Sequence, residues 1–337
     1  MKEKLVNFAR RTSLRQLRAL GAAARTGSVT AAAEQLAVTP PAVAQQLRLL
    51  EEALDGMPLL EKTPGGLRPT EAGREALAAL ARIEAALADC AAAVEALQGM
   101  ETGRVAVGVT STAKYFAPFA LAAFQRAYPR IELRLLVGNR EQTVAALEAF
   151  ELDVAVMGYP PERFPVERAV IGDHPHVIIG APGHRLVRRR GIPLREVTDE
   201  TLLLREPGSG TRDLMQRLFA AAGLAMPAAP SLEIGSNETI KQAVMAGMGI
   251  ALISAHTIAA EVRDGRLAIL DVEGLPAVRQ WFAVRRSEKR LLPAARAMWD
   301  HLLRHGAGYL PAVGAPAQSG IARAPNAARS SRGRVDR

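Results

Sequence analysis

The chain has 337 residues, 49% of them hydrophobic, so it can bury substantial cores and is expected to hold two or three domains. Its single cysteine, Cys90, excludes an internal disulfide and a metal site built from several cysteines, and it favours a reducing compartment. The net charge of +9 lies at the two ends, because residues 1–70 hold ten basic and six acidic side chains and residues 311–337 hold five and one. A basic N-terminal region suits a nucleic-acid partner, although the same excess could serve solubility alone.

The first residues do not resemble a signal peptide, because residues 1–11 lack an adequate apolar core. No run of the sequence is long and apolar enough to span a bilayer. We therefore expect a cytoplasmic protein with no membrane partner. Residues 2–13 are predicted to be a short polar lead-in to a first helix that starts with Leu14, Leu17 and Leu20.

Residues 28–54 predict two short helices joined by a tight turn. Ser28 has the chemistry of a helix N-cap, and Thr39 is expected to cap the second helix. Pro40 and Pro41 fall in the first turn of that helix, where their missing amide protons cost nothing because those donors have no partner within the helix. The start of the second helix is therefore sharply fixed.

The second helix is predicted to have an apolar face and a polar face. Its apolar positions recur at helical spacing and form a buried stripe of Val43, Leu47, Leu50 and Leu54. The opposite face is small and polar at first and basic one turn later, and it carries Pro41, Ala44, Gln45 and Arg48. A helix that reads the major groove of DNA needs this layout, although any helical hairpin of an all-α domain could show it for structural reasons alone.

A β-hairpin is predicted at residues 59–70, where two apolar-flanked runs surround Pro64-Gly-Gly66. Lys62 and Arg68 lie on its two arms, as in the wing of a winged helix. Residues 28–54, this hairpin and Thr70-Glu-Ala-Gly73 resemble the DNA-binding domain of the LysR-type transcriptional regulators, and the resemblance extends over residues 14–305.

The resemblance implies that residues 1–70 form a winged helix-turn-helix domain. The implied DNA-binding residues are Ser28, Thr39, Pro40, Pro41, Ala44, Gln45, Arg48, Lys62 and Arg68. Many relatives have glutamine and serine where Pro40 and Ala44 stand, and arginine where Lys62 and Gly65 stand. We therefore expect Gln45 and Arg48 to carry more of the DNA contact.

A long linker helix is predicted at residues 71–102, since residues 71–98 contain no proline and are dominated by alanine. Its larger apolar residues alternate at steps of three and four, which is a heptad seam: Leu80, Ile83, Leu87, Cys90, Val94 and Leu97. We expect this helix to pair with the same helix of a second subunit, with Cys90 as a small residue of the seam. The alternative is an amphipathic helix that packs on its own domain.

Strands and helices alternate from residue 103 onward, which predicts parallel, doubly wound sheets. Strands are expected at 104–109, 131–137, 152–157, 176–181, 249–254, 267–270 and 280–285, and helices at 116–128, 141–150, 211–222, 237–246 and 291–304. Residues 103–310 then form two lobes of the periplasmic-binding-protein type with a cleft between them. Lobe I would hold about 103–177 and 271–310, and lobe II about 178–270. The fold class is therefore α+β multidomain.

Three segments could line the predicted cleft, because open α/β sheets bind ligands beyond the carboxyl ends of their strands and helix N-termini favour anions. They are Thr110-Ser111-Thr112, Ser209-Gly210-Thr211-Arg212 and Ser236-Asn237. Each alone could be only a helix cap or a tight turn. The resemblance adds that LysR-type regulators hold small anionic effectors with the corresponding loops, and that Gly158 and Gly249 stand where the backbone approaches the ligand.

No catalytic or metal-binding pattern stands out. The six histidines lack metal-ligand spacing, Gly208-Ser-Gly210 lacks the nucleophile-elbow pattern, and no phosphate-binding P-loop occurs. We expect neither an enzyme nor a cofactor. A solute-binding transport protein or an enzyme could share the two lobes, but the first needs an export signal and the second needs a catalytic group. Residues 311–337 are rich in small residues, proline and arginine and are expected to be a disordered basic tail.

Within the LysR type, residues 36–43, 137–143, 152–162 and 174–184 look most like regulators of Calvin-cycle (RuBisCO) operons. This resemblance implies operator DNA, RNA polymerase and a second copy of the chain as partners, in a homodimer or homotetramer. It also implies a phosphorylated metabolite or nucleotide as effector, such as ribulose bisphosphate, phosphoenolpyruvate or NADPH. A LysR-type regulator of another metabolic operon is the alternative.

Overall fold

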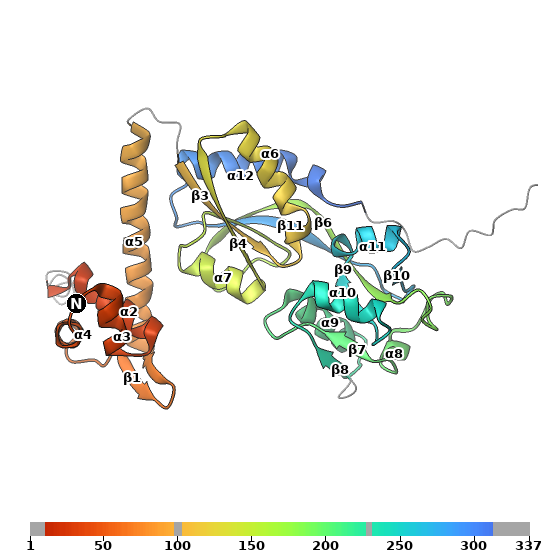
Figure 1. Ribbon diagram of the computed structural model, residues 1–337, viewed down its shortest axis with the longest axis horizontal. Coiled ribbons are helices and arrows are strands. Elements are labelled where there is room, and N and C mark those ends of the chain that lie inside the picture. The colour runs from red at the N-terminus through yellow and green to blue at the C-terminus, as the bar shows by residue number, and fades with distance from the viewer. Residues whose placement is uncertain (1–10, 98–102, 227–230, 313–337) are drawn as a thin grey trace, which may run out of the picture. The chain divides into compact units, whose positions relative to one another are not determined.

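The computed structural model describes residues 11–97, 103–226 and 231–312 (Figure 1). The chain divides into two compact units. Unit 1 comprises Met1–Pro175, Glu206–Leu214 and Val278–Leu310, and unit 2 comprises His176–Arg205, Met215–Ala277 and Pro311–Arg337. The predicted tail falls outside the described residues from position 313 onward, as do residues 98–102 of the predicted linker.

Three helices form the N-terminal part of unit 1: α2 (Leu14–Thr26), α3 (Val29–Leu36) and α4 (Pro40–Ala53). Ser28 caps α3, since its hydroxyl accepts a hydrogen bond from the amide of Ala31 at 3.4 Å. Thr39 occupies the N-cap position of α4, but in the described part of the chain its side chain makes no cap hydrogen bond. The start of α4 is therefore set by its two leading prolines, whose fixed φ angle suits the first helical turn.

Small side chains allow these helices to pack closely. Alanines of α2 and α3 and Val43 of α4 form one buried cluster, and leucines form a second: Leu17, Leu20, Leu50, Leu59 and Leu80. Each alanine buries little apolar area, but it lets the helix backbones approach closely. The leucine cluster supplies the larger share of buried apolar area per residue in this small domain.

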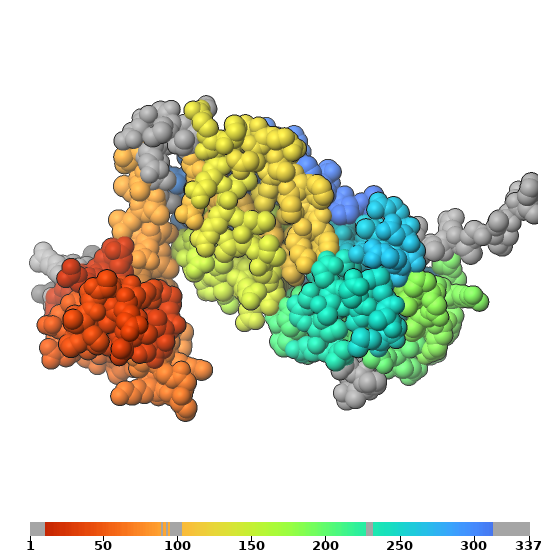
Figure 2. Space-filling model, in the orientation of Figure 1, coloured from red at the N-terminus to blue at the C-terminus, as the bar shows by residue number. Residues whose placement is uncertain are grey.

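The wing is an antiparallel hairpin of β1 (Leu60–Thr63) and β2 (Gly66–Pro69). In the space-filling view it protrudes from the body of the three helices (Figure 2). Helix α5 (Glu71–Leu97) follows directly, and Thr70 orders the junction. Its hydroxyl donates to the Pro58 carbonyl at 2.7 Å and accepts from the Gly73 amide at 3.1 Å. Gly73 itself lies against the Leu59 carbonyl, where a larger residue would clash.

The remainder of unit 1 is built on a sheet whose centre is β3 (Gly103–Thr110). It pairs in parallel with β4 (Ile131–Gly138) and with β5 (Val154–Met157). Strand β11 (Ala277–Arg286) pairs with β5 in the antiparallel sense. The sheet is therefore mixed, whereas the sequence predicts a parallel sheet. The difference arises because β11 follows the passage of the chain through unit 2 and runs back in the opposite direction.

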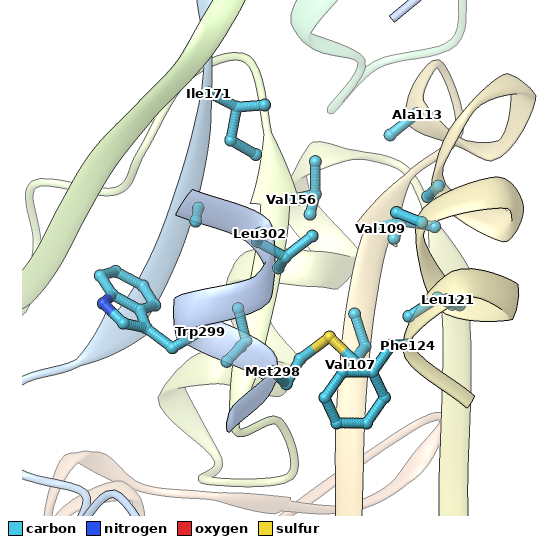
Figure 3. Packing of buried hydrophobic residues seen from close by; sticks show 14 of the residues in the cluster. Val107, Val109, Ala113, Leu121, Phe124, Val156, Ile171, Met298, Trp299 and Leu302 are labelled. Atoms are coloured by element: carbon cyan, nitrogen blue, oxygen red, sulfur yellow. The ribbon is translucent and has the colours of Figure 1, made fainter. Parts of the chain in front are cut away.

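Alternate residues of β3 pack into two cores on opposite faces of the sheet. Val105, Val107 and Val109 lie under helices α6 (Ala117–Ala127) and α12 (Pro293–His305), which contribute Phe124, Met298 and Leu302 (Figure 3). On the other face Ala106 packs with Leu147 of α7 (Arg140–Glu148). The carboxyl end of β3 is thus held rigidly from both faces, which positions the loop that follows it.

Unit 2 contains the second half of β6 (Val166–Gly180), which pairs with β9 (Ala251–Ser254) and β10 (Ala268–Ile269) in the antiparallel sense. A short parallel pair joins β7 (Leu202–Leu204) to β8 (Ser231–Glu233). The helices of unit 2 are α8 (Leu194–Val197), α10 (Asn237–Met245), α11 (Ala259–Arg263) and the second part of α9 (Gly210–Ala221), whose residues 210–214 belong to unit 1. Ile179, Ile240, Val244 and Ile253 are central to its core. Among the described residues, no helix has both the length and the apolar character to cross a membrane.

Candidate nucleic-acid interface and effector site

Helix α4 presents the predicted DNA-reading face to the surface. Pro40, Pro41, Ala44, Gln45 and Arg48 are all exposed, while Val43 and Leu50 of the same helix are buried. Arg48 pairs with Glu52 one turn later at 3.6 Å, but its side chain remains 71% exposed. Such an exposed pair within a helix is weak, so the Arg48 guanidinium can exchange Glu52 for a phosphate.

The two basic residues of the wing lie on opposite faces of the hairpin. Arg68 stands across from Glu61, and Lys62 stands across from Leu67. Since directly opposed residues of a hairpin share a face and neighbours along a strand alternate, Lys62 and Arg68 do not form one cationic patch. Both are exposed, as a wing that meets DNA requires.

The predicted seam of α5 divides into a buried and an exposed part. Leu80 is only 5% exposed, because it packs against Leu17 and Leu20 of α2 in its own domain. The prediction that Leu80 belongs to an intersubunit seam is therefore corrected. Ile83, Leu87 and Val94 are 40–51% exposed and Cys90 is exposed, which leaves these four available to a partner, while the Leu97 side chain lies outside what the structure describes.

The carboxyl ends of the parallel strands β3, β4 and β5 meet at one edge of the unit 1 sheet. Thr110 ends β3 and Thr112 follows it. They are 7% and 6% exposed, with their hydroxyls 3.5 Å apart. The Ser111 amide donates to the Gly138 carbonyl at the end of β4 at 2.7 Å. The Thr110 hydroxyl reaches the Val156 carbonyl of β5 at 3.5 Å. The predicted hydroxyl cluster thus stands where open sheets bind their ligands.

Residues 206–214 join the same edge. The Glu141 amide at the start of α7 donates to the Gly208 carbonyl at 3.3 Å, and Arg279 Nη1 donates to the Gly210 carbonyl at 3.3 Å. Ser209 and Thr211 are buried, at 3% and 5% exposed, and Arg212 is half-buried. The sequence assigned this segment to lobe II, whereas these bonds hold it in unit 1 with Thr110–Thr112.

The two positions where the backbone was predicted to approach the ligand, Gly158 and Gly249, also need glycine for packing. A Cβ atom on Gly158 would lie 2.6 Å from Nδ1 of His174, whose ring stacks on Trp281 at 3.7 Å. Gly249 has a φ angle of +157° and lies against the Thr201 carbonyl of unit 2. Glycine is therefore required at both positions whether or not a ligand approaches, and their role in binding stays a prediction.

Asn237 lies in unit 2 and is 1% exposed at the first position of α10, which Ser236 caps. Its side-chain oxygen accepts a hydrogen bond from Arg205, which is itself 3% exposed. The structure therefore gives Asn237 a partner inside unit 2, and a contact with an effector stays a prediction.

Three residues of this edge were missed by the sequence reasoning: Arg140, Tyr159 and Arg279. Arg140 follows the carboxyl end of β4 and Tyr159 follows that of β5, so the rule that singled out Thr110 could have found both. Arg279 lies near the start of β11, which reaches this edge only because β11 runs antiparallel to β5. Local sequence patterns carry no sign of that pairing.

Comparison with known proteins decides the family. Residues 14–74 match the bacterial regulatory helix-turn-helix proteins of the lysR family, and residues 98–307 match the LysR substrate binding domain. The chain belongs to the LysR family. The predicted family and fold class are thereby confirmed.

Relatives of this LysR-family chain include the HTH-type transcriptional regulator CbbR of Xanthobacter flavus, 54% identical over 89% of this chain and 90% of the relative. The RuBisCO operon transcriptional regulator of Allochromatium vinosum is 41% identical over 88% of this chain and 97% of the relative.

Among solved structures, the Synechocystis PCC6803 CcmR regulatory domain in complex with 2-PG is 36% identical, with a TM-score of 0.57 over 60% of this chain and 97% of that one. Full-length CbnR with its target DNA is 22% identical, with a TM-score of 0.59 over 87% of this chain and 99% of that one, and supports the fold alone. In the described part of this LysR-family chain, no three His, Cys, Asp or Glu side chains gather where they could hold a metal ion.

Proposed function

We propose that this LysR-family protein regulates a Calvin-cycle (RuBisCO) operon in response to a small anionic metabolite. The observation that carries the proposal is the 54% identity to the CbbR regulator of Xanthobacter flavus, which extends over 89% of the chain and so spans both the DNA-binding and the effector-binding parts. The named relatives are transcriptional regulators, and we propose likewise that this chain has no enzymatic activity.

The effector is proposed to be a phosphorylated metabolite or nucleotide bound at the edge formed by Thr110–Thr112 and Ser209–Arg212. Buried hydroxyls at the ends of strands, the N-terminus of α9 and several guanidinium groups together favour an anion. The CcmR regulatory domain, which is 36% identical, binds 2-PG, a small anionic metabolite. Gly158, Asn237 and Gly249 are proposed as further effector-site residues.

On DNA, α4 is proposed to enter the major groove, with Gln45 at base edges and Arg48 at phosphate. The exposure of one face of α4 supports this role. Lys62 and Arg68, on opposite faces of the wing, would contact phosphates or the walls of the minor groove. Ser28, Thr39, Pro40, Pro41 and Ala44 complete the proposed surface.

Assembly is proposed to run through the exposed face of α5, where Ile83, Leu87, Cys90 and Val94 would pair with a second copy, in a homodimer or homotetramer. A ligand can shift a two-state protein only by its difference in affinity for the two states. We therefore propose that the effector changes how linked DNA-binding domains lie on the operator and how RNA polymerase is engaged, in the cytoplasm.

The test is binding of the purified full chain to its own upstream DNA, measured by fluorescence anisotropy with and without ribulose bisphosphate, phosphoenolpyruvate, NADPH and 2-PG. We expect tighter binding to this DNA than to a random duplex, and a change in affinity with at least one metabolite. Equal affinity for both duplexes would reject the regulatory assignment, and indifference to all four metabolites would reject the effector class.

A further inference from the structure

Two arginines from different elements contact one aromatic ring at the effector edge of unit 1. The guanidinium carbon of Arg140, at the start of α7, lies 4.7 Å from the centre of the Tyr159 ring, and that of Arg279, in β11, lies 5.4 Å from it. Arg140 Nε also donates to the Tyr159 carbonyl at 3.2 Å. Stacking on a ring orients a guanidinium group without neutralising its charge.

The same two arginines converge on Gly210, the first residue of α9. Arg279 Nη1 donates to the Gly210 carbonyl at 3.3 Å, and the Arg140 side chain comes within 3.6 Å of the position that a Cβ atom on Gly210 would take. Arg212 lies in the first turn of the same helix. The segments that meet around Gly210 thus carry three guanidinium groups, those of Arg140, Arg212 and Arg279.

The bonds of Arg140 and Arg279 to carbonyl oxygens are of a kind that an anion can replace. Phosphate and carboxylate add the attraction of a full negative charge, which a neutral carbonyl lacks, and they can accept two hydrogen bonds at once from one guanidinium group. Glu141, Glu206 and Asp213 lie on the same segments and limit the net positive charge. Recognition must therefore come from the placement of the guanidinium groups and not from a general positive potential.

We propose that Arg140 and Arg279 are specificity-determining residues of the effector site that bind a second anionic group of the effector. The effector then carries two separated anionic groups, one at the hydroxyls of Thr110–Thr112 and one at this arginine pair, as in a bisphosphate or in a phosphate with a carboxylate. The inference rests on the proposed function and narrows the class of metabolite that it names.

Calorimetry on the full chain tests the inference with four probes. Ribulose bisphosphate, phosphoenolpyruvate and 2-PG are the candidate effectors, and inorganic phosphate supplies one anionic group only. Arg140→Gln and Arg279→Gln should each weaken the tightest candidate about 10- to 100-fold, the range expected for one charged hydrogen bond. Their affinity for inorganic phosphate should stay within about twofold of wild type, because Thr110–Thr112 is intact.

Arg134→Gln is the matched control, since Arg134 is an exposed arginine of β4 outside this cluster, and it should leave every affinity unchanged. Retained operator binding and an unchanged circular dichroism spectrum show that a variant is folded. If a glutamine variant does not fold, the corresponding lysine variant keeps the charge but not the forked donors, and it should still lose at least about fivefold in affinity.

Wild-type affinity of both glutamine variants for the tightest candidate would overturn the inference and leave the proposed function standing. An equal loss of affinity for that candidate and for inorganic phosphate would also overturn the inference, because the arginines would then maintain the structure of the whole site and not bind a second anionic group. If the wild-type chain binds none of the three candidates, the anionic effector and the inference fall together.

Discussion

Gly66 of the wing lies so close to Gly27 at the end of α2 that a Cβ atom on Gly66 would come within 2.7 Å of the Gly27 carbonyl oxygen. That carbonyl accepts a hydrogen bond from the next amide of the wing, Leu67, at 2.8 Å. Gly66 also has a φ angle of +105°, which residues with a Cβ atom rarely adopt. The direction of the wing is therefore fixed by backbone contact with the turn between α2 and α3.

Gly66→Ala should consequently destabilise the N-terminal domain by about 1–3 kcal/mol and weaken operator binding, because the new methyl group forces the wing away from Gly27. Urea unfolding of the full chain, with operator affinity as second readout, measures both effects. Gly65→Ala is the matched control, since a Cβ there meets only the Thr63 hydroxyl at 4.0 Å. Equal stability of the two variants would contradict the role given to this contact.

The helix-turn-helix was predictable to within a residue or two because its signals are local. A cap at Ser28, prolines at the start of α4 and a stripe at helical spacing each act over one or two turns of chain. The seam of α5 shows the limit of such signals. Periodicity identified Leu80 as apolar and inward-facing, but it could not tell whether the partner was a second subunit or α2 of the same chain.

The effector edge was predictable only in part for a related reason. Thr110–Thr112 follows a strand directly, so its place could be inferred from the chain around it. Arg279 and the first turn of α9 reach this edge through antiparallel pairing of β11 and through backbone bonds to α7, which join residues far apart in sequence. The first half of β6 was also missed, because its exposed, charged residues hide the strand pattern.

The second prediction concerns base reading by α4. Gln45→Ala should weaken binding to the cognate operator by about 1–3 kcal/mol and relax the sequence preference of the protein, because an amide side chain can bond two atoms of one base. Arg68→Ala is the contrasting variant and should lower affinity for all DNA and flatten the salt dependence. Anisotropy titrations on cognate and random duplexes at several salt concentrations measure both. An equal loss on both duplexes for Gln45→Ala would exclude base reading by that side chain.

The third prediction concerns assembly. Leu87 is 50% exposed, so Leu87→Glu should be harmless to a monomer. In a paired helix it would bury a charge at a cost of several kcal/mol, and it should yield monomers that lose specific DNA binding. Sedimentation velocity distinguishes these outcomes.

Ala78→Glu is the matched control for Leu87→Glu. It is exposed and lies nine positions earlier, about two and a half helical turns away and hence on the opposite face. It should sediment as wild type. A Leu87→Glu variant that also keeps the wild-type oligomer would show that this stripe is not an interface.

The fourth prediction concerns pH. His301 is 8% exposed on α12, with its Nε2 atom 3.1 Å from the Ala120 carbonyl. Burial lowers the pKa of His301 below its ordinary value of 6.5, the hydrogen bond to Ala120 acts in the opposite direction, and His305 and Arg304 lower it further. The folded state thus disfavours the imidazolium form. Stability contributed by neutral His301 is complete above the unfolded pKa and is lost as the pH falls below it.

His301→Gln should therefore reduce the fall in unfolding free energy between about pH 7 and about pH 5, whatever its effect on stability at pH 7. Urea unfolding at several pH values measures this slope. His305→Gln is the contrasting variant and should change this slope less than His301→Gln does, because His305 is exposed and acts only by lowering the pKa of His301. An unchanged slope in His301→Gln would show that His301 does not link proton binding to folding.

The last prediction concerns the hydroxyl of Thr112, which is buried beside that of Thr110 at the effector edge. Thr112→Val replaces the hydroxyl by a methyl group of similar size, so the packing at the end of β3 should survive. If the hydroxyl bonds the effector, affinity should fall by roughly 1–3 kcal/mol, since a buried acceptor on the ligand is left unpaired. Calorimetry with the phosphorylated metabolite that binds most tightly measures this loss of affinity.

Thr112→Ser is the control variant, because it keeps the hydroxyl and should retain most of the affinity. Operator binding without ligand should be unchanged in both variants, because residues 14–74 carry the DNA-binding match. Unchanged ligand affinity in Thr112→Val would remove this hydroxyl from the site, whereas equal losses in both variants would assign the effect to packing, because only the valine variant lacks the hydroxyl.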